Sequence, residues 1–94
     1  MKKKFLHIYI NPKQGVTQND IEEKMSLALD WYRYDDKIYL VYTSSDASKW
    51  QGRLIKFVQG GGRLFISPLD IDSKTGWMEK DFWEFIKSKK LNEL

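Results

Sequence analysis

The sequence predicts an α+β fold, in which one small sheet packs against helices. Runs of alternating apolar residues, typical of strands, occur at residues 5–10, 37–43 and 63–69. Stretches with the helical spacing of apolar residues lie between and after these runs. The 94 residues are 41% hydrophobic, which suits one small domain with a core of its own.

Residues 5–10 form the first predicted strand, which ends before Pro12 and Gly15. Its alternation places aliphatic side chains on one face of the sheet and side chains with rings on the other. The side chains with rings are Phe5, His7 and Tyr9. This strand therefore has one face suited to a core and a second, aromatic face.

The first helix is expected to begin within residues 17–20. Asn19 can cap the free backbone amides there, with Glu22 as the answering partner. Apolar residues then recur at helical spacing in one stripe: Ile21, Met25, Ala28, Leu29 and Tyr32. The stripe predicts a helix with one buried side.

Residues 37–43 form the second clear strand, and residues 31–34 precede it across a turn at Asp35 and Asp36. Because aromatic residues favour strands, we expect 31–34 to pair antiparallel with 37–43. The second strand should also lie beside the first. The alternative is that 31–34 complete the first helix.

The second helix is expected after a capping segment made of Ser44, Ser45 and Asp46. Its inner face carries a stripe of apolar residues: Ala47, Trp50, Leu54, Phe57 and Val58. The three glycines at residues 60–62 end it. The sequence therefore predicts a helix between the second and third clear strands.

Residues 63–69 form the third clear strand, and Pro68 indicates that its end lies at an edge or past the last ladder bond. Residues 77–89 form the last predicted helix. Its inward side chains are Met78, Phe82, Phe85 and Ile86. This helix follows the sheet in the chain and can cover one of its faces.

With residues 31–34 counted as a strand, the element order is βαββαβ followed by a helix. This is the split arrangement of a ferredoxin-like fold with an added C-terminal helix, so residues 1–94 form one ferredoxin-like domain. Without that strand the chain would be a three-stranded parallel α/β unit. We favour the first, because three strands give a small sheet few ways to cover both faces.

A resemblance to known proteins rests on the run DWYRYDDKIYLVYTSSDASKWQGRLIKFVQGGGRLFISPLDIDSKTGWMEKDFWEFI. It has an aromatic pair, a strand ending in Thr, a Ser-led helix, a glycine turn, a strand, and Gly-Trp before a Trp-containing helix. This pattern resembles short bacterial proteins described as SinR-like. They are similar to the ferredoxin-like CRISPR adaptation subunit and to virulence-associated protein D. The resemblance implies the fold, a homodimer, a bacterial or phage source, and a link to nucleic acid, defence or toxin–antitoxin systems.

Two positions are candidates for a metal site. In the ferredoxin-like nucleases that the chain resembles, an aspartate at the end of the first strand holds a metal. The matching residue here is Asn11, which offers an oxygen without charge and is a poor ligand for a hard divalent cation. Asp70 and Asp72 could hold Mg²⁺, because both carboxylates leave the same side of an extended chain. The alternative is that they form the polar end of a strand.

The aromatic face of the first strand is the main candidate binding surface. Tyr39 or Tyr42 could lie alongside Phe5, His7 and Tyr9, forming a platform on which bases of single-stranded RNA or DNA stack. The same face could instead pack under the last helix or against a second subunit. We expect a homodimer to which Tyr9, Tyr39 and Tyr42 contribute most.

Two motifs resemble anion-binding sites, and only one of them has the right polarity. The glycines at residues 60–62 follow a helix and open a strand, the reverse of a phosphate loop, so this role is excluded. Ser44 and Ser45 stand before a helix, where hydroxyls and helix amides could hold one phosphate. A plain N-cap is the alternative, and Asp46 would repel an anion.

Composition narrows the function. The chain has no cysteine, which excludes disulfides, thiolate zinc sites and a cysteine nucleophile, and favours the reducing cytoplasm. No apolar run approaches the roughly 18 residues of a membrane span. The net charge of +3 is compatible with nucleic acid. We therefore expect a cytoplasmic, non-enzymatic interaction module without a cofactor. The alternatives are a metal-dependent nuclease using Asp70 and Asp72, and a protein-binding immunity or antitoxin subunit.

Overall fold

A computed structural model of the chain describes residues 2–92. Within this range the chain forms an antiparallel four-stranded sheet and three α-helices, so the predicted α+β class is confirmed. No helix in these residues is long and apolar enough to cross a membrane. The elements, in chain order, are β1 (Lys4–Asn11), α1 (Gln18–Met25), β2 (Asp30–Asp35), β3 (Ile38–Thr43), α2 (Ala47–Leu54), the 3-10 turn η1 (Ile55–Phe57), β4 (Arg63–Leu69), the 3-10 turn η2 (Ile71–Ser73) and α3 (Lys80–Asn92).

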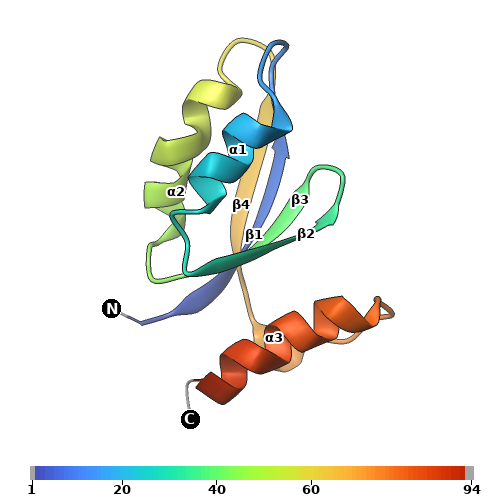
Figure 1. The fold of residues 1–94 in the computed structure, drawn as a ribbon. Helices are drawn as coiled ribbons and strands as arrows, with labels where there is room; N and C mark the ends of the chain where they lie inside the picture. Colours follow the sequence, from blue (N-terminus) through green and yellow to red (C-terminus); the bar gives the residue numbers. More distant parts are fainter. Residues whose placement is uncertain (1, 93–94) are drawn as a thin grey trace.

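The strands lie in the order β2-β3-β1-β4, and each neighbouring pair is antiparallel (Figure 1). Two predictions are confirmed here: β2 pairs with β3 across a tight turn, and β3 lies beside β1. In the register of the sheet, Ile8 of β1 stands between Tyr39 of β3 and Ile66 of β4. These three side chains therefore share one face.

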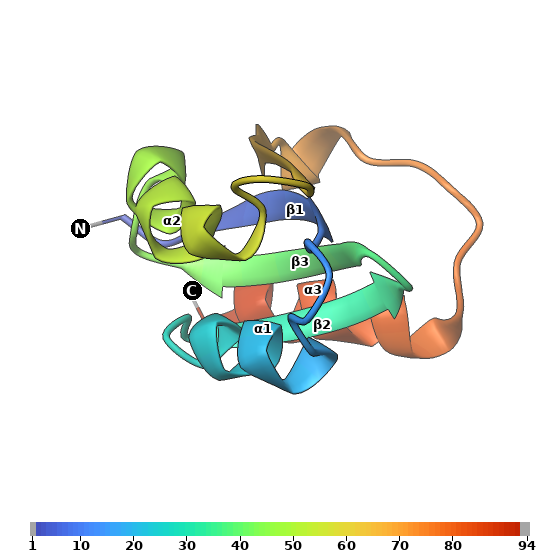
Figure 2. The same cartoon turned by 90° about the horizontal axis from the view of Figure 1, so that it is seen from above.

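Helices α1 and α2 cover one face of the sheet, and α3 lies on the opposite face (Figure 2). The larger core lies under α1 and α2. It takes the aliphatic side of β1, as its alternation predicted, and the inner sides of both helices. Its buried members include Leu6, Ile8, Ile10, Ile21, Met25, Val41, Trp50 and Leu54.

Helix α3 closes a second, smaller core on the other face. Ile86 packs there against Phe5, Leu40 and Tyr42 of the central strands. Two polar contacts tie the helix and the segment before it to β2: Lys89 Nζ lies 2.5 Å from Asp30 Oδ2, and the Tyr32 hydroxyl donates to Glu79 at 2.9 Å. The helix therefore sits over β2, β3 and one end of β1, and away from the start of β4.

Helix α1 begins within the predicted residues 17–20, but its capping residue and its end differ from the prediction. Its N-cap is Thr17 rather than Asn19. Thr17 Oγ1 accepts from the amide of Asp20 at 3.1 Å, and the Asp20 carboxylate accepts from the amide of Thr17 at 3.0 Å. The helix stops at Met25 because the following chain joins the sheet. Leu29, which the helical stripe included, instead donates its amide to the carbonyl of Tyr42 at 2.9 Å.

Helix α3 begins at Lys80, whereas the sequence predicted a start at Trp77. Figure 2 shows the connection from β4 to α3 looping outward from the sheet. Trp77 lies on this connection and is 98% exposed. The prediction began the helix at Trp77 without counting Trp77 among its inward side chains. Since its ring contacts no core, the helix gains nothing by extending to it.

Candidate functional site

Three ring side chains lie together on the sheet face opposite α1 and α2. Tyr9 of β1 is the direct cross-strand partner of Phe65 of β4, and His7 is the partner of Ser67. Phe65 is 62% exposed, and Tyr9 and His7 are half-buried. We call His7, Tyr9 and Phe65 the β1–β4 aromatic patch. It is the part of this face that α3 leaves open.

A hollow of about 400 Å³ adjoins the patch. The sheet contributes His7, Tyr34 and Leu69 to it, and the connection before α3 and the helix itself contribute the rest. The remaining large apolar lining residues are Ile71, Trp77, Met78, Phe82, Trp83 and Ile86. A mostly apolar hollow of this size with a few polar groups is typical of ligand sites. Its mouth and the patch share His7, so the two form one continuous surface.

The imidazole of His7 is suited to stacking rather than to carrying charge. Its ring lies 6.0 Å from the ring of Tyr34, centroid to centroid. Partial burial lowers its pKa from the usual value, because removal from water disfavours the charged form. At neutral pH the ring is therefore an uncharged, partly exposed surface at the edge of the hollow.

Charged side chains lie on this face and in the hollow. Arg63 begins β4 and is the cross-strand partner of Asn11 at the end of β1. By the alternation of both strands, Arg63 and Asn11 are on the same face as Tyr9 and Phe65. Lys74 and Asp70 both line the adjoining hollow. Arg63 therefore adds positive charge to the face that carries the rings, which suits a ligand with both aromatic and anionic parts.

The other aromatic residues named from the sequence do not belong to the exposed surface. Tyr39 was expected as a possible neighbour of His7 and Tyr9, and this is wrong: it pairs with Ile8 and faces α1 and α2, only 2% exposed. Phe5 and Tyr42 are on the aromatic face, but both are buried beneath α3. Of the alternatives left open for these two residues, packing under the last helix is the one that the structure shows.

Asp70 and Asp72 follow the end of β4, where Asp70 caps η2 by accepting from the amide of Asp72 at 3.1 Å. Both line a hollow of about 230 Å³ that Lys2, Lys3 and Lys4 also line. The described residues contain no group of three His, Asp or Glu side chains placed to hold a metal ion. The hollow therefore has both acidic and basic side chains in its lining.

Ser44 and Ser45 precede α2, as expected, but Asp46 is the residue that caps it. The Asp46 carboxylate accepts from the amide of Lys49 at 2.8 Å, and the amide of Ser45 donates to Thr43 Oγ1 at 3.0 Å. A carboxylate therefore stands where a phosphate would meet the helix amides, which disfavours an anion at this position.

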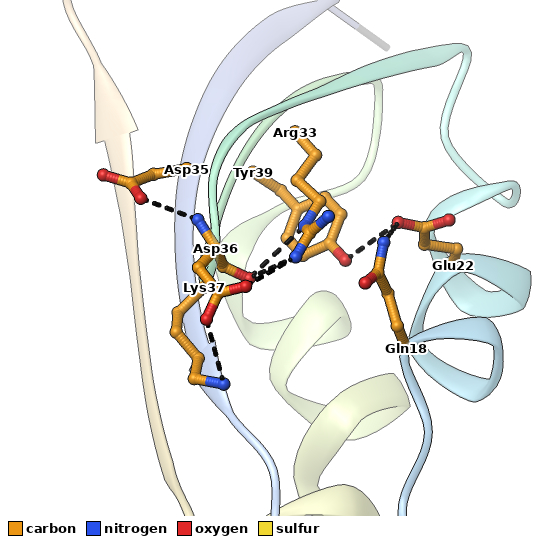
Figure 3. Close-up of polar contacts among 7 residues, drawn as sticks. All are labelled: Gln18, Glu22, Arg33, Asp35, Asp36, Lys37 and Tyr39. Atoms are coloured by element: carbon orange, nitrogen blue, oxygen red, sulfur yellow. Dashed lines mark hydrogen bonds and ion pairs between the residues drawn. The ribbon is translucent and has the colours of Figure 1, made fainter.

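Two polar networks lie near each other, one between β3 and α1 and one within the β2–β3 turn (Figure 3). The Tyr39 hydroxyl and the Gln18 amide both donate to the carboxylate of Glu22, at 3.2 and 2.7 Å. Arg33 donates to the backbone and carboxylate of Asp36, both at 2.9 Å. Burial, with the Glu22 carboxylate beside it, raises the pKa of Tyr39 to about 12. The first network therefore ties β3 to α1, and the second stabilises the β2–β3 turn.

Sequence reasoning missed Phe65, the most exposed ring of the patch, and the part that Trp77 and Trp83 play in the hollow. Alternation along β4 did separate Phe65 from Leu64 and Ile66. The partner strand that brings Phe65 beside Tyr9 is not visible in that alternation. Comparisons with protein-family models, with curated proteins and with solved structures find no match to this chain.

Proposed function

We propose that this protein is a non-enzymatic interaction module that binds single-stranded RNA on the β1–β4 aromatic patch. One observation carries the proposal: Tyr9 and Phe65 are cross-strand partners on an open sheet face, and Phe65 is 62% exposed. Stacking of a base on such a ring contributes about 1–3 kcal/mol and tolerates any sequence.

The surroundings of the patch also support RNA binding. Arg63 is on the same face as the patch and Lys74 lines the adjoining hollow, so both offer positive charge to the phosphates of a bound strand. The hollow of about 400 Å³ next to His7 has room for a second base. The net charge of +3 adds a general attraction to polyanions. RNA is the proposed ligand, and DNA is the competitor to be tested beside it.

The proposal includes the finer fold assignment. The strand order β2-β3-β1-β4, with α1 and α2 on one face, supports a ferredoxin-like domain to which α3 is the added C-terminal helix. The resemblance to SinR-like proteins, and through them to nucleic-acid-associated bacterial systems, agrees with this assignment. The absence of cysteine favours the cytoplasm as its compartment.

Fluorescence anisotropy with a labelled oligouridylate tests the proposal, and its oligodeoxythymidylate counterpart tests RNA against DNA. Binding should weaken as salt rises, because phosphate contacts release counterions. Phe65→Ala should weaken it about tenfold through loss of one stacking surface, and Phe65→Tyr should keep it. Leu27→Ala is the control, since Leu27 is 56% exposed and follows α1 on the other side of the sheet.

Two results would overturn the proposal. One is an affinity that Phe65→Ala leaves unchanged, or the absence of salt-dependent binding. The other is cleavage of the oligonucleotide with Mg²⁺ or Mn²⁺ that is lost in both Asp70→Ala and Asp72→Ala. That second result would establish the nuclease alternative. Tighter binding of DNA than of RNA would change the ligand and retain the site.

The expected homodimer would use the same patch. Phe5, Tyr39 and Tyr42 are buried inside one subunit, so within the patch Tyr9 and Phe65 are the large rings that a second subunit could cover. Burying a large side chain contributes about 1.5–3 kcal/mol, and association costs about 4–15 kcal/mol. We therefore propose that self-association is weak and that it competes with RNA. An immunity or antitoxin role would need a protein partner on this patch instead.

A further inference from the structure

The hollow beside the β1–β4 aromatic patch has a wall made of rings in contact with one another. The rings of His7 and Tyr34, both on the sheet, have centroids 6.0 Å apart. The rings of Tyr34 and Phe82 are 5.2 Å apart, and those of Phe82 and Trp83 are 5.3 Å apart. All four residues line the hollow of about 400 Å³. The sheet and α3 therefore present a continuous aromatic wall to it.

A fifth ring, that of Trp77, lines the same hollow from the connection between β4 and α3. Trp77 is 98% exposed, so its indole lies almost wholly in water. Figure 2 shows the connection looping outward from the sheet, and residues 74–79 within it belong to no helix or strand. Loops of this kind, held by a rigid scaffold, often carry binding residues. An inward movement of residues 74–79 would break no helix or sheet bond and would bring the indole over the hollow.

The polar groups of the hollow indicate the chemistry of its ligand. Asp70, Ser73, Lys74 and Thr75 contribute a carboxylate, an ammonium group and two hydroxyls to its lining. A wholly apolar ligand would cover these groups without replacing their water. A nucleobase offers a flat ring to the aromatic wall and donors and acceptors at its edge. A purine suits the hollow best, because its two fused rings give the larger stacking surface.

The position of the hollow relates it to the patch. His7 belongs to both, and Tyr9 stands two residues further along β1 on the same face, a distance of about 7 Å. An RNA strand with one base stacked on Tyr9 and Phe65 would therefore have a neighbouring base at the mouth of the hollow.

We propose that the hollow binds one purine base of the RNA strand and that Trp77 closes over this base. The base stacks between the indole and the aromatic wall, and its edge meets the polar groups of the connection. The inference rests on the proposed function, to which it adds a preference for a purine at one position. Stacking on the patch alone tolerates any base, so the two proposals predict different sequence dependence.

Fluorescence anisotropy with three labelled RNA strands tests the preference: oligouridylate, and the same strand with one central adenine or one central guanine. A strand with a purine should bind about tenfold more tightly than oligouridylate. Trp77→Ala should abolish this difference, and Trp77→Phe, which keeps a ring, should retain part of it. Because Trp77 is 98% exposed, both variants should fold, and their amide spectra report whether they do. Phe65→Ala should weaken binding of all three strands and keep the difference, and Leu27→Ala should change neither.

The indole N–H signal of Trp77 reports the closure itself. In the ¹⁵N-labelled full chain this signal is identified by its loss in Trp77→Phe. It should shift when a strand with a purine binds, and it should exchange with water more slowly. Adenosine monophosphate should bind at least about tenfold more weakly than the strand with adenine, because it cannot reach the hollow and the patch together.

Equal affinities for the three strands would overturn the inference and leave RNA binding on the patch intact. A purine preference that survives in Trp77→Ala, or an indole signal that does not move when the strand binds, would also overturn it. Adenosine monophosphate that binds as tightly as the strand would assign the hollow to a free nucleotide instead. Failure of all three strands to bind would overturn the proposed function, and this inference with it.

Discussion

Thr43 is a residue whose hydroxyl accepts from two donors at once. Its Oγ1 accepts from the buried indole N–H of Trp50 at 3.1 Å and from the amide of Ser45 at 3.0 Å. Thr43 is buried and Trp50 is fully buried, so water cannot easily replace the acceptor. Thr43, which no sequence motif marks, therefore joins the end of β3 to the middle of α2.

Thr43→Val keeps the shape of this side chain and removes the acceptor. We expect the free energy of unfolding to fall by about 1–3 kcal/mol, the cost of leaving a buried donor unsatisfied. Urea denaturation followed by tryptophan fluorescence measures the change. Thr43→Ser, which keeps the hydroxyl and loses a methyl group, is the control. An equal or larger loss in Thr43→Ser would show that packing, and not the hydrogen bond, is what matters.

Tyr39 gives a prediction about alkaline pH. Its pKa is raised to about 12, by burial first and then by Glu22, whereas tyrosine in an unfolded chain has a pKa of about 10. The folded state therefore favours the neutral phenol. The stability that this shift contributes is complete below about pH 10 and is lost as pH rises towards 12.

The stability difference between the native protein and Tyr39→Phe isolates this effect. It should be constant up to about pH 10 and should shrink above it, because only the native protein has this phenol to ionise. Urea denaturation of both proteins across this range measures it. Ultraviolet titration should also show that Tyr39→Phe lacks the last tyrosine to ionise. A difference that stays constant across the whole range would contradict the raised pKa.

At the scale of elements, the end of η1 is packed tightly against the end of β1. A Cβ atom at Gly62 would lie 2.5 Å from the carbonyl oxygen of Asn11, 2.9 Å from Cα of Val58 and 3.0 Å from the amide nitrogen of Lys13. All three are backbone atoms, which cannot swing aside as a side chain can. Gly62 is therefore required, because the backbone just after β1 and the backbone just after η1 both approach it closely.

Gly62→Ala should lower the free energy of unfolding by about 1–3 kcal/mol, the usual cost of overpacking. Thermal or urea denaturation measures it. Gly61→Ala is a matched control one residue away, where the added Cβ would meet only the Cβ of Lys13 at an ordinary 3.6 Å. Similar losses in the two variants would mean that chain flexibility, and not contact, explains the glycine.

The elements were predictable from sequence wherever the signal is local. Alternation along β1 predicts which side chains face the helices, and the aromatic residues 31–34 predict β2. The same alternation along residues 37–43 already separates Tyr39 from Tyr42, so the misplacement of Tyr39 was avoidable. The pairing of Tyr9 with Phe65 depends on which strand lies next to β1, and no local pattern carries that register. The end of α1 likewise depends on a non-local contact, the hydrogen bond from the Leu29 amide to the carbonyl of Tyr42 in β3.

At the scale of the whole molecule, one surface serves two proposed partners. Sedimentation of the protein across a hundredfold range of concentration should show a weak monomer–dimer equilibrium. Saturating oligouridylate should shift it to the monomer, because Tyr9 and Phe65 cannot be buried twice. Phe65→Leu should retain more self-association than RNA binding, since it keeps apolar bulk and loses the ring. A dimer that is unaffected by RNA would place the dimer contact elsewhere.

The position of β1 between β3 and β4 also has a consequence for how the chain folds. Tyr9 of β1 pairs with Ile38 of β3 and with Phe65 of β4, so both pairings of β1 bring together residues that are far apart in the chain. In contrast, β2 and β3 meet across a short turn. Loop closure costs entropy before any contact compensates for it. The β2–β3 hairpin can form in about 1–10 μs. Strand β1 can pair only when β3 and β4, which follow much later in the chain, reach it. During synthesis β1 is made before the other three strands of this sheet, and its ladder with β4 cannot form until β4 has been translated.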